Sequence, residues 1–600
     1  MAERSAPLRP EAASGEGLPL LLGGGMAVGI STPALVKAVS TYEVPCLGRG
    51  LCLGITSGTA AANLLARRLQ HGDTRVRLAL DALAALAPSL DSELNALHSA
   101  YFIPGGKAAS QPYKPVRAFG LDPPRWLQLL TIAGNFTTVW ECKQGHEGPV
   151  GINYLQKIEL SQLPALYGAM LAGVDYVCVG AGNPAAFPGH LRGLARREPV
   201  EQIVHVARAT KPHTIHFDPQ GFGGKELPEL REPRFIAIVS ACEQAEQLAG
   251  SEATRPFGFV FEGPSAGGHN APPADYRRIL GEPPKWGAKD ELDLRRLAGL
   301  HEPFWLAGAC GNPEGLRRAL EVGAAGVQFG TILAFSNESG MSPALRLRAL
   351  ARIWHKNLAV VTEPLMSPTG FPFKVVQLSG SLSEEAVRSG RERVACCDLG
   401  HLVTPVETKR RVTRPDGGIE EVVDVQTLCP AEPFETFMRK GGVAMRRKGT
   451  ICLCNGLMST AGYPGIRGDY VEPPVVTAGD ASVKDVRELQ VQVRRLTYSA
   501  AEAIARVLRG IEDGVGSSAR LRGRRSQAAG GAAHECPGNF TQETRRLKSR
   551  MRESWTCSRN PIKPTPRAWE LTPARGRPRA PGIRGGQAGK RSCYARAGAT

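Results

Sequence analysis

Short apolar runs that end in glycine or a small polar residue recur along the first half of the chain. They read LPLLLGGGM from Leu18, GPVGINYL from Gly148, VDYVCVGAG from Val174, RFIAIVSAC from Arg234, FGFVFEG from Phe257, PFWLAGA from Pro303 and AAGVQFGT from Ala324. Stretches rich in Ala, Leu, Arg and Glu separate several of these runs and are typical of helices. Strands that alternate with helices imply a parallel α/β sheet, and glycine at the carboxyl ends of strands is typical of a ligand site. The pattern therefore predicts a (β/α)₈ barrel, that is, a TIM barrel.

Three segments depart from this alternation. A helical stretch at about 60–119 is too long for an ordinary loop, so we expect an insertion within a barrel domain of residues 1–375. Residues 376–513 contain five cysteines and end in the helical sequence SAAEAIARVLRGIE, which predicts a C-terminal extension with a closing helix. Residues 514–600 are rich in Arg, Gly, Pro and Ser and have almost no apolar period, so we expect them to be disordered.

The formal net charge of +18 is concentrated at the end of the chain. Residues 515–600 hold 19 of the 74 Lys and Arg residues but only 4 of the 56 Asp and Glu residues, so the remainder is nearly neutral. A protein that tracks nucleic-acid phosphates needs cationic side chains arrayed over its folded surface. The charge distribution therefore argues against nucleic-acid binding by the body of the protein.

The first residues indicate where the protein resides. They include early acidic side chains and one short apolar run, Leu20 to Leu22, which predicts neither a signal peptide nor a membrane span. We therefore expect a cytoplasmic protein with no membrane partner, whose 14 cysteines are mostly reduced thiols. The sequence leaves homo-oligomer formation open.

The segment FVFEGPSAGGHNAPP combines a strand that ends at Glu262 with a glycine pair that precedes His269. Glycines allow the backbone to approach a flat ligand closely. A histidine on such a loop can act as a general base or a hydrogen-bond donor. Taken alone, the segment also fits an ordinary turn histidine.

A second segment, PFWLAGACGNPEGLRRALEVGAAGVQFGT, predicts a phosphate site. It contains two glycine-rich turns, and a helix begins near Pro313 after the first of them. Backbone N–H groups at Gly308, Ala309 and Gly311 can face a phosphate together with the helix N-terminus, while Gly330 and Thr331 close the site from the second turn. Phosphate sites of barrels commonly follow the seventh and eighth strands.

These motifs together resemble a known family. The ordered segments GGGMAVGISTPALVKAVS, LGITSGTA, GPVGINYL, EGPSAGGHNAPP, AGACGNPEGLRRALEVGAAGVQFGT and SPTGFPFK are similar to nitronate monooxygenases, also called 2-nitropropane dioxygenases. The later CDLG, CPAEP, CLCNGLMSTAGYP and LTYSAAEAI segments resemble a longer branch of that family. The resemblance implies an FMN-binding (β/α)₈ barrel that oxidises alkyl nitronates with O₂ to a carbonyl compound and nitrite.

The resemblance also implies roles for individual residues. His269 would face the substrate beside the flavin, where it orients the nitronate or deprotonates a neutral nitroalkane. The expected FMN-binding residues are Gly25, Met26, Asn153, Gly268, Gly308, Ala309, Gln328, Gly330 and Thr331. Two features depart from the family pattern: Ala309 stands where glycine is usual, and the TYEVPCLGRGLCLG link between the first two strands is longer.

Two other functions remain open from the sequence. An FMN-dependent enoyl-thioester reductase that takes hydride from NAD(P)H shares the AGGH and GT segments with nitronate monooxygenases. A non-catalytic flavin-binding protein is the second alternative, because fold-level similarity does not determine chemistry.

Cysteine and histidine residues outside these motifs could form further sites. Cys397, Cys429, Cys452 and Cys454 could converge on zinc or an iron–sulfur cluster, but their irregular spacing favours buried structural thiols with no metal, and Cys396 would be a bystander. His205, His213 and His216 are expected to lie in a solvated loop, and Lys374 is expected to cap a strand at the surface.

Overall fold

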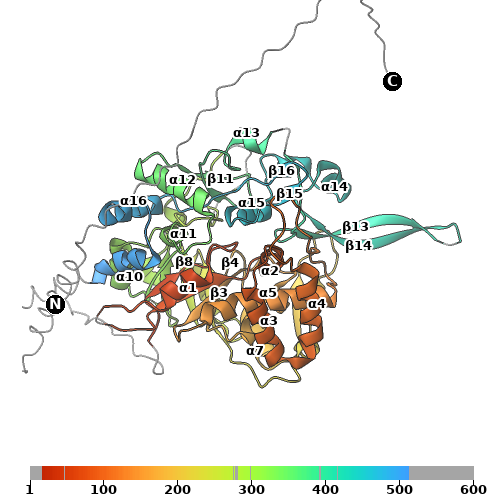
Figure 1. The fold of residues 1–600 in the computed structure, drawn as a ribbon, viewed down its shortest axis with the longest axis horizontal. Helices are drawn as coiled ribbons and strands as arrows, with labels where there is room; N and C mark the ends of the chain where they lie inside the picture. The colour runs from red at the N-terminus through yellow and green to blue at the C-terminus, as the bar shows by residue number, and fades with distance from the viewer. Residues whose placement is uncertain are drawn as a thin grey trace, which may run out of the picture. The chain divides into compact units, whose positions relative to one another are not determined.

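The computed structural model describes residues 17–511 except 46, 274, 275, 277–281, 298, 391, 392 and 415. Eight of its strands form a closed parallel barrel (Figure 1). They are β1 (Leu21–Gly23), β2 (Cys52–Ser57), β3 (Val150–Leu155), β4 (Tyr176–Gly180), β7 (Arg234–Val239), β8 (Gly258–Glu262), β9 (Phe304–Ala307) and β10 (Gly326–Phe329). The strands follow one another around the barrel in chain order, and β10 closes it by pairing with β1, where Leu21 lies opposite Val327. The predicted (β/α)₈ barrel is confirmed, whereas the predicted disorder of 514–600 lies outside the described residues.

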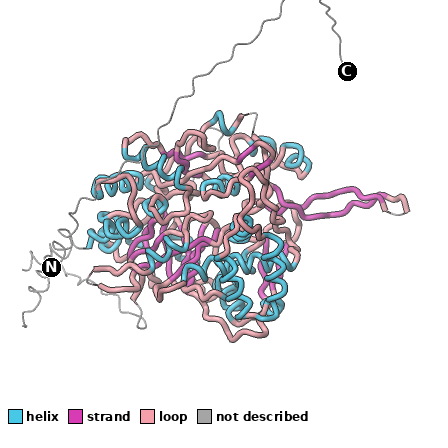
Figure 2. Tube along the Cα trace, in the orientation of Figure 1, coloured by secondary structure: helices cyan, strands magenta, loops and turns pink. Residues whose placement is uncertain are grey.

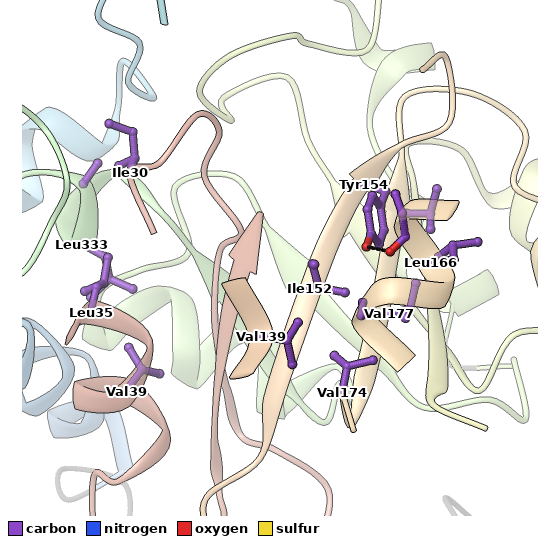
Figure 3. Close-up of a cluster of buried hydrophobic side chains, with 14 of the residues drawn as sticks. Ile30, Leu35, Val39, Val139, Ile152, Tyr154, Leu166, Val174, Val177 and Leu333 are labelled. Carbon is purple, nitrogen blue, oxygen red and sulfur yellow. Dashed lines mark hydrogen bonds between the residues drawn. The ribbon is translucent and has the colours of Figure 1, made fainter. Parts of the chain in front are cut away.

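Alternation of side chains along the strands builds two packed layers. One set of large side chains fills the barrel interior, as in other barrels with eight parallel strands. It comprises Leu22, Leu53, Ile55, Tyr176, Cys178, Ile236, Val260 and Trp305. The other set faces the surrounding helices, and Figure 3 shows Ile152 and Val177 of the barrel strands beside Val139 and Leu166 of two helices.

The helices that connect the barrel strands lie around the barrel (Figure 2). They are α1 (Pro33–Ser40), α5 (Arg125–Lys143), α6 (Gln162–Leu171), α7 (Phe187–Ala195), α8 (Cys242–Ala249), α9 (Leu294–Leu297) and α10 (Pro313–Glu321). The start of α1 shows why a helix begins at this point of the sequence: Thr32 is the N-cap, and its side-chain oxygen accepts the Leu35 N–H at 3.1 Å. Leu35 and Val39 then point one face of α1 toward the core, near Leu333 (Figure 3).

Two groups of elements interrupt the barrel. Between β2 and β3, α2 (Ala61–Gln70), α3 (Arg75–Leu86) and α4 (Asp91–Tyr101) precede α5, within the range where the sequence predicts a helical insertion. Arg68 of α2 ties this group to α5, because its guanidinium lies 2.8 Å from Asp73 and 2.6 Å from Glu141. Between β4 and β7, β5 (Val200–Val204) and β6 (His213–Phe217) form a hairpin. His213 and His216 therefore lie on a strand, and their predicted place in a loop is wrong.

The chain after β10 covers the carboxyl ends of the barrel strands, and residues 475–478 near its end still line the cavity there. It contains α11 (Thr331–Ala334), α12 (Pro343–Trp354), β11 (Val360–Glu363), β12 (Phe373–Val376), α13 (Glu385–Arg388), β13 (Thr404–Thr413), β14 (Ile419–Leu428), α14 (Phe434–Arg439), α15 (Leu453–Thr460), β15 (Ile466–Arg467), β16 (Tyr470–Val471) and α16 (Ser482–Val493). The hairpin of β13 and β14 is the long ribbon in Figures 1 and 2. Residues 500–511 are helical, as the apolar period predicts. Within the described residues, no helix is both long and apolar enough to cross a membrane.

Candidate functional site

A cavity of about 500 Å³ lies at the carboxyl ends of the barrel strands. Its volume falls in the usual range for small-molecule sites, and this end of a barrel is where ligand sites normally lie. The cavity brings together every site residue that the sequence predicts. These are Gly25, Met26, Asn153, Gly268, His269, Gly308, Ala309, Gln328, Gly330 and Thr331.

The ends of β1 and β3 form one wall of the cavity and approach each other closely. A Cβ atom on Gly25 would lie 2.3 Å from Asn153 Cβ and 2.6 Å from the Thr56 carbonyl oxygen, so no larger residue fits there. The Asn153 amide donates a hydrogen bond to the Gly25 carbonyl at 3.2 Å, while its Oδ1 atom is buried without a partner. Glycine at position 25 is therefore required by strand packing, and Asn153 keeps one acceptor for a ligand.

The turn after β9 forms another end of the cavity wall. Gly308 and Ala309 both adopt positive φ angles, +85° and +54°. Ala309, which stands where the family usually has glycine, therefore adopts a backbone conformation that glycine usually supplies. Among the described residues, the Ala309 and Gly311 N–H groups donate no hydrogen bond outside regular helices and strands. Asn312 then caps α10 by accepting the Gly315 N–H at 2.8 Å. Free N–H groups beside a capped helix N-terminus are suited to an anion.

The turn after β10 completes this end of the cavity. Gln328 Oε1 is a second buried acceptor without a partner. The Thr331 hydroxyl accepts the Gly479 N–H at 2.9 Å, which attaches the C-terminal extension to the barrel. An acceptor that is buried without a partner costs free energy, and a ligand that donates a hydrogen bond would remove that cost.

His269 lies on the loop after β8 and is held from two sides. Its Nε2 atom is 2.7 Å from the Ser367 hydroxyl, which in turn lies 2.7 Å from the Thr369 hydroxyl. Its ring packs edge-on against Phe373, with ring centroids 5.0 Å apart. Burial, and secondarily the charge of Lys157, lowers the pKa of His269 well below its usual value. The imidazole is therefore neutral at pH 7 and suited to hydrogen bonding rather than to carrying charge.

Two charged side chains accompany His269 in the cavity. Lys157 follows the end of β3, and burial lowers its pKa to about 8 against the opposing effect of Glu262. Glu262 ends β8, and burial raises its pKa to about 7 against the opposing effect of Lys157. The sequence indicates Glu262 only as a neighbour of the motif and does not indicate Lys157, although its position two residues after an apolar strand was an available signal.

The C-terminal extension supplies another part of the wall that the sequence motifs do not predict. Residues 475–478 line the cavity, and a Cβ atom on Gly267 would lie 2.8 Å from the Ala478 carbonyl carbon. Thr477 Oγ1 is buried there without a partner. Lys374, expected at the surface, is instead buried and ion-paired with Asp480 at 2.8 Å, so that expectation is wrong.

The longer link between the first two strands lies away from the cavity. It connects α1 to the amino end of β2, where Val44 forms an isolated bridge with Gly48. The cavity is formed at the opposite, carboxyl ends of the strands. This departure from the family pattern therefore does not alter the cavity wall directly.

The predicted cysteine group gathers in one hydrophobic cluster beside the cavity. Cys397 hydrogen-bonds to Cys429 and Cys452 to Cys454, and these contacts, followed by burial, raise the pKa values of Cys397 and Cys452. Raised pKa values keep these thiols protonated. In the part of the chain that the structure describes, no group of three or more His, Cys, Asp or Glu side chains has an arrangement that could hold a metal ion.

Comparisons with known proteins give remote similarities. No protein-family model matches the chain, and no curated protein matches it. A structure of FabK from Thermotoga maritima is 15% identical, with 84% of this chain and 96% of that chain covered at a TM-score of 0.40. A nitroalkane oxidase from Streptomyces ansochromogenes is 14% identical, with 83% and 98% covered at a TM-score of 0.37.

A third solved structure is the enoyl reductase domain of MlnA from the macrolactin biosynthesis cluster of Bacillus amyloliquefaciens. It is 13% identical, with 62% of this chain and 66% of that chain covered at a TM-score of 0.30. Identities and superpositions this low carry no conclusion about chemistry. The barrel assignment rests on the strand order of this chain, and the function has to be argued from its own cavity.

Proposed function

We propose that this protein is an FMN-dependent oxidoreductase that oxidises alkyl nitronates with O₂. The observation that carries the proposal is that one cavity gathers His269, the glycine-rich turns and the unpartnered acceptors at the carboxyl ends of the barrel strands. The overall reaction converts two nitronate anions and one O₂ into two carbonyl compounds and two nitrite ions. Homo-oligomer formation and a cytoplasmic location are not needed by this proposal and remain predictions.

The residues present fit FMN. Asn153 Oδ1 and Gln328 Oε1 are buried acceptors without partners, and the flavin N3–H group and the ribityl hydroxyls are donors that could satisfy them. The N–H groups of Ala309 and Gly311, together with the N-terminus of α10, would hold the phosphate. Gly25, Met26, Gly268, Gly308, Gly330 and Thr331 would contribute the remaining contacts along the wall. Bound FMN would supply the electron acceptor for oxidation of the substrate.

The role of His269 follows from its protonation state. A neutral imidazole whose Nε2 is engaged by Ser367 has a fixed ring orientation, so it can present its other nitrogen at one place in the cavity. A histidine with a strongly lowered pKa is a weak base. His269 therefore orients a nitronate that enters already deprotonated, and this role is favoured over removal of a proton from a neutral nitroalkane.

The test begins with the visible spectrum of the purified full chain. A flavin spectrum, followed by O₂ consumption and nitrite release on addition of ethyl nitronate, is the expected result. Flavin reduction by NADPH in a protein that does not respond to ethyl nitronate would instead favour an enoyl-thioester reductase. A yellow protein that turns over neither substrate would indicate a flavin-binding protein without this chemistry. A colourless protein that FMN cannot reconstitute would contradict the cofactor assignment.

A further inference from the structure

Lys157 is a buried lysine in the cavity wall, and no described residue provides a hydrogen-bond partner for its ammonium group. Its ammonium nitrogen is buried and has no hydrogen-bond partner. The nearest favourable contact is the face of Phe371, whose ring centroid is 4.5 Å from the nitrogen. A buried ammonium group without a hydrogen-bond partner is costly, because three donors lose their contact with water.

Glu262 balances the charge of Lys157 only in part. The two groups interact through space, since each opposes the effect of burial on the pKa of the other. Lys157 nevertheless makes no hydrogen bond to that carboxylate. Lys157 lines the cavity, so its ammonium group is a cationic donor in the cavity wall without a hydrogen-bond partner.

We propose that Lys157 forms an anion-binding subsite that holds a negatively charged oxygen of the substrate beside His269. The inference rests on the proposed function, because it names the substrate of that cavity as an anion. The subsite lies near His269, because the Lys157 ammonium contacts the ring of Phe371 and both residues line the same cavity as His269. The segment that carries Phe371 also carries Ser367, which hydrogen-bonds to His269.

The unpartnered atoms on the other side of the cavity suit a different molecule. Asn153 Oδ1 and Gln328 Oε1 are acceptors and need a donor, whereas Lys157 is a donor and needs an acceptor. A nitronate has two negatively charged oxygens, so one oxygen can accept from Lys157 and the other from His269. A neutral substrate of the same shape would leave the buried ammonium charge uncompensated.

The experiment uses propionate, which has the shape and charge of ethyl nitronate but does not react, and propionamide, its neutral counterpart. Binding to the full-length protein with FMN bound is followed by saturation-transfer NMR. We expect propionate to bind at least about tenfold more tightly than propionamide, which corresponds to ~1.4 kcal/mol. Lys157→Met should remove this preference and Lys157→Arg should retain it. Lys374→Met is the matched control, because it removes a buried lysine that pairs with Asp480 outside this subsite.

A second measurement, on the unmodified protein, tests the anion subsite even where a variant fails to fold. Glu262 and His269 face Lys157 from β8 and its loop, and Arg117, Glu159 and His401 line the small pocket behind it. Because the Lys157 pKa is about 8, propionate affinity should fall as the pH rises from 7 to 9.5. Equal binding of the two probes, no binding of propionate, or an affinity that does not change over this pH range would overturn the proposal.

The outcomes separate this inference from the proposed function. Lys157-dependent binding of propionate by a protein that does not oxidise ethyl nitronate would retain the anion subsite and remove the proposed reaction. Oxidation of ethyl nitronate by a protein in which Lys157→Met leaves the propionate preference intact would retain the reaction and remove the subsite.

Discussion

The two sides of the cavity are built from different chemistry. The side formed by β1, β3, β9 and β10 presents backbone N–H groups, glycines and the carboxamides of Asn153 and Gln328. The side around Lys157, which follows β3, and around Glu262 and His269 of β8 and its loop presents titratable groups buried in the wall. The first side depends on shape, because an added Cβ atom on Gly25 would overlap Asn153 and Thr56, whereas the second depends on charge and protonation. Substitutions that change shape and substitutions that change charge should therefore affect different steps.

The largest effect is expected on the charged side, at His269. Replacement of His269 by Ala should lower kcat for ethyl nitronate by about 10²–10³-fold, the usual cost of removing one preorganised hydrogen-bond donor from an active site. The FMN content should stay unchanged, because the predicted cofactor contacts do not include the His269 side chain. Steady-state O₂ consumption and the visible spectrum measure the two properties.

Ser367→Ala is the matched comparison for this variant. It removes the hydroxyl at 2.7 Å from His269 Nε2 and leaves the imidazole in place. We expect a loss of about tenfold, because the ring loses its orientation rather than its hydrogen-bonding atoms. Unchanged turnover in His269→Ala with FMN bound would show that this histidine has no role in the reaction.

The second effect belongs to the side that depends on shape. Gly25→Ala places a Cβ atom 2.3 Å from Asn153 Cβ and should weaken FMN binding by about 1–3 kcal/mol, the usual cost of overpacking. Gly24→Ala is the adjacent control, because its Cβ atom would meet its nearest neighbour at 3.4 Å. Fluorescence titration of the apoprotein with FMN gives both affinities. Equal affinities for the two variants would contradict the packing argument.

Much of the shape-dependent side could be predicted from the sequence. Each of its glycine turns directly follows an apolar strand, and parallel strands place their carboxyl ends at one edge, so local pattern and topology predict that the turns at Gly25 and Gly308 meet. Asn153 and Gln328 are indicated by the resemblance of their segments to nitronate monooxygenases. The same reasoning predicts His269. These residues carry their signal in short continuous segments.

The charged side could be predicted only in part. Lys157 looks like any lysine after a strand, and its burial depends on Phe371, more than 200 residues later in the chain. Ser367 lies between β11 and β12, and residues 475–478 belong to the C-terminal extension. Neither segment has a sequence period that relates it to the barrel. The sequence predicts Lys374 at the surface, because it does not show that Asp480 lies beside this lysine in the fold.

A third, smaller effect concerns pH. Below pH 7 Glu262 is protonated and only the positive charge of Lys157 acts on an anionic substrate, so the KM for ethyl nitronate should be lowest there. As the pH rises through 7, Glu262 becomes ionised and repels the anionic substrate. This repulsion should raise KM by about fivefold to tenfold, because an electrostatic interaction that shifts a pKa by one unit corresponds to a tenfold change in an equilibrium constant. Glu262→Gln should remove this step and leave one rise that belongs to Lys157, at a pH below 8, because the substitution removes the carboxylate that raises the Lys157 pKa.

Glu159→Gln is the control for this profile. Glu159 is another carboxyl whose pKa is raised by burial, but it lines the small neighbouring pocket and hydrogen-bonds to Gln156. Its substitution should leave the KM profile unchanged. A KM profile that still shows two steps in Glu262→Gln would assign the first titration to a different group.

The smallest effect is expected on FMN affinity at Asp485, a charged residue on the shape-dependent side of the cavity. Asp485 lines the cavity near the turn after β9, where its carboxylate accepts from Asn312 at 3.1 Å, and burial raises its pKa to about 6. At pH 8 the ionised carboxylate should repel the FMN phosphate, so Asp485→Asn should tighten FMN binding by about twofold to fivefold, or ~0.4–1 kcal/mol. At pH 5 the protonated carboxyl and the amide are both neutral, and the difference should vanish. A weakening at both pH values would mean that Asp485 acts through the position of Asn312, and that this side of the cavity depends on shape even where it carries a charge.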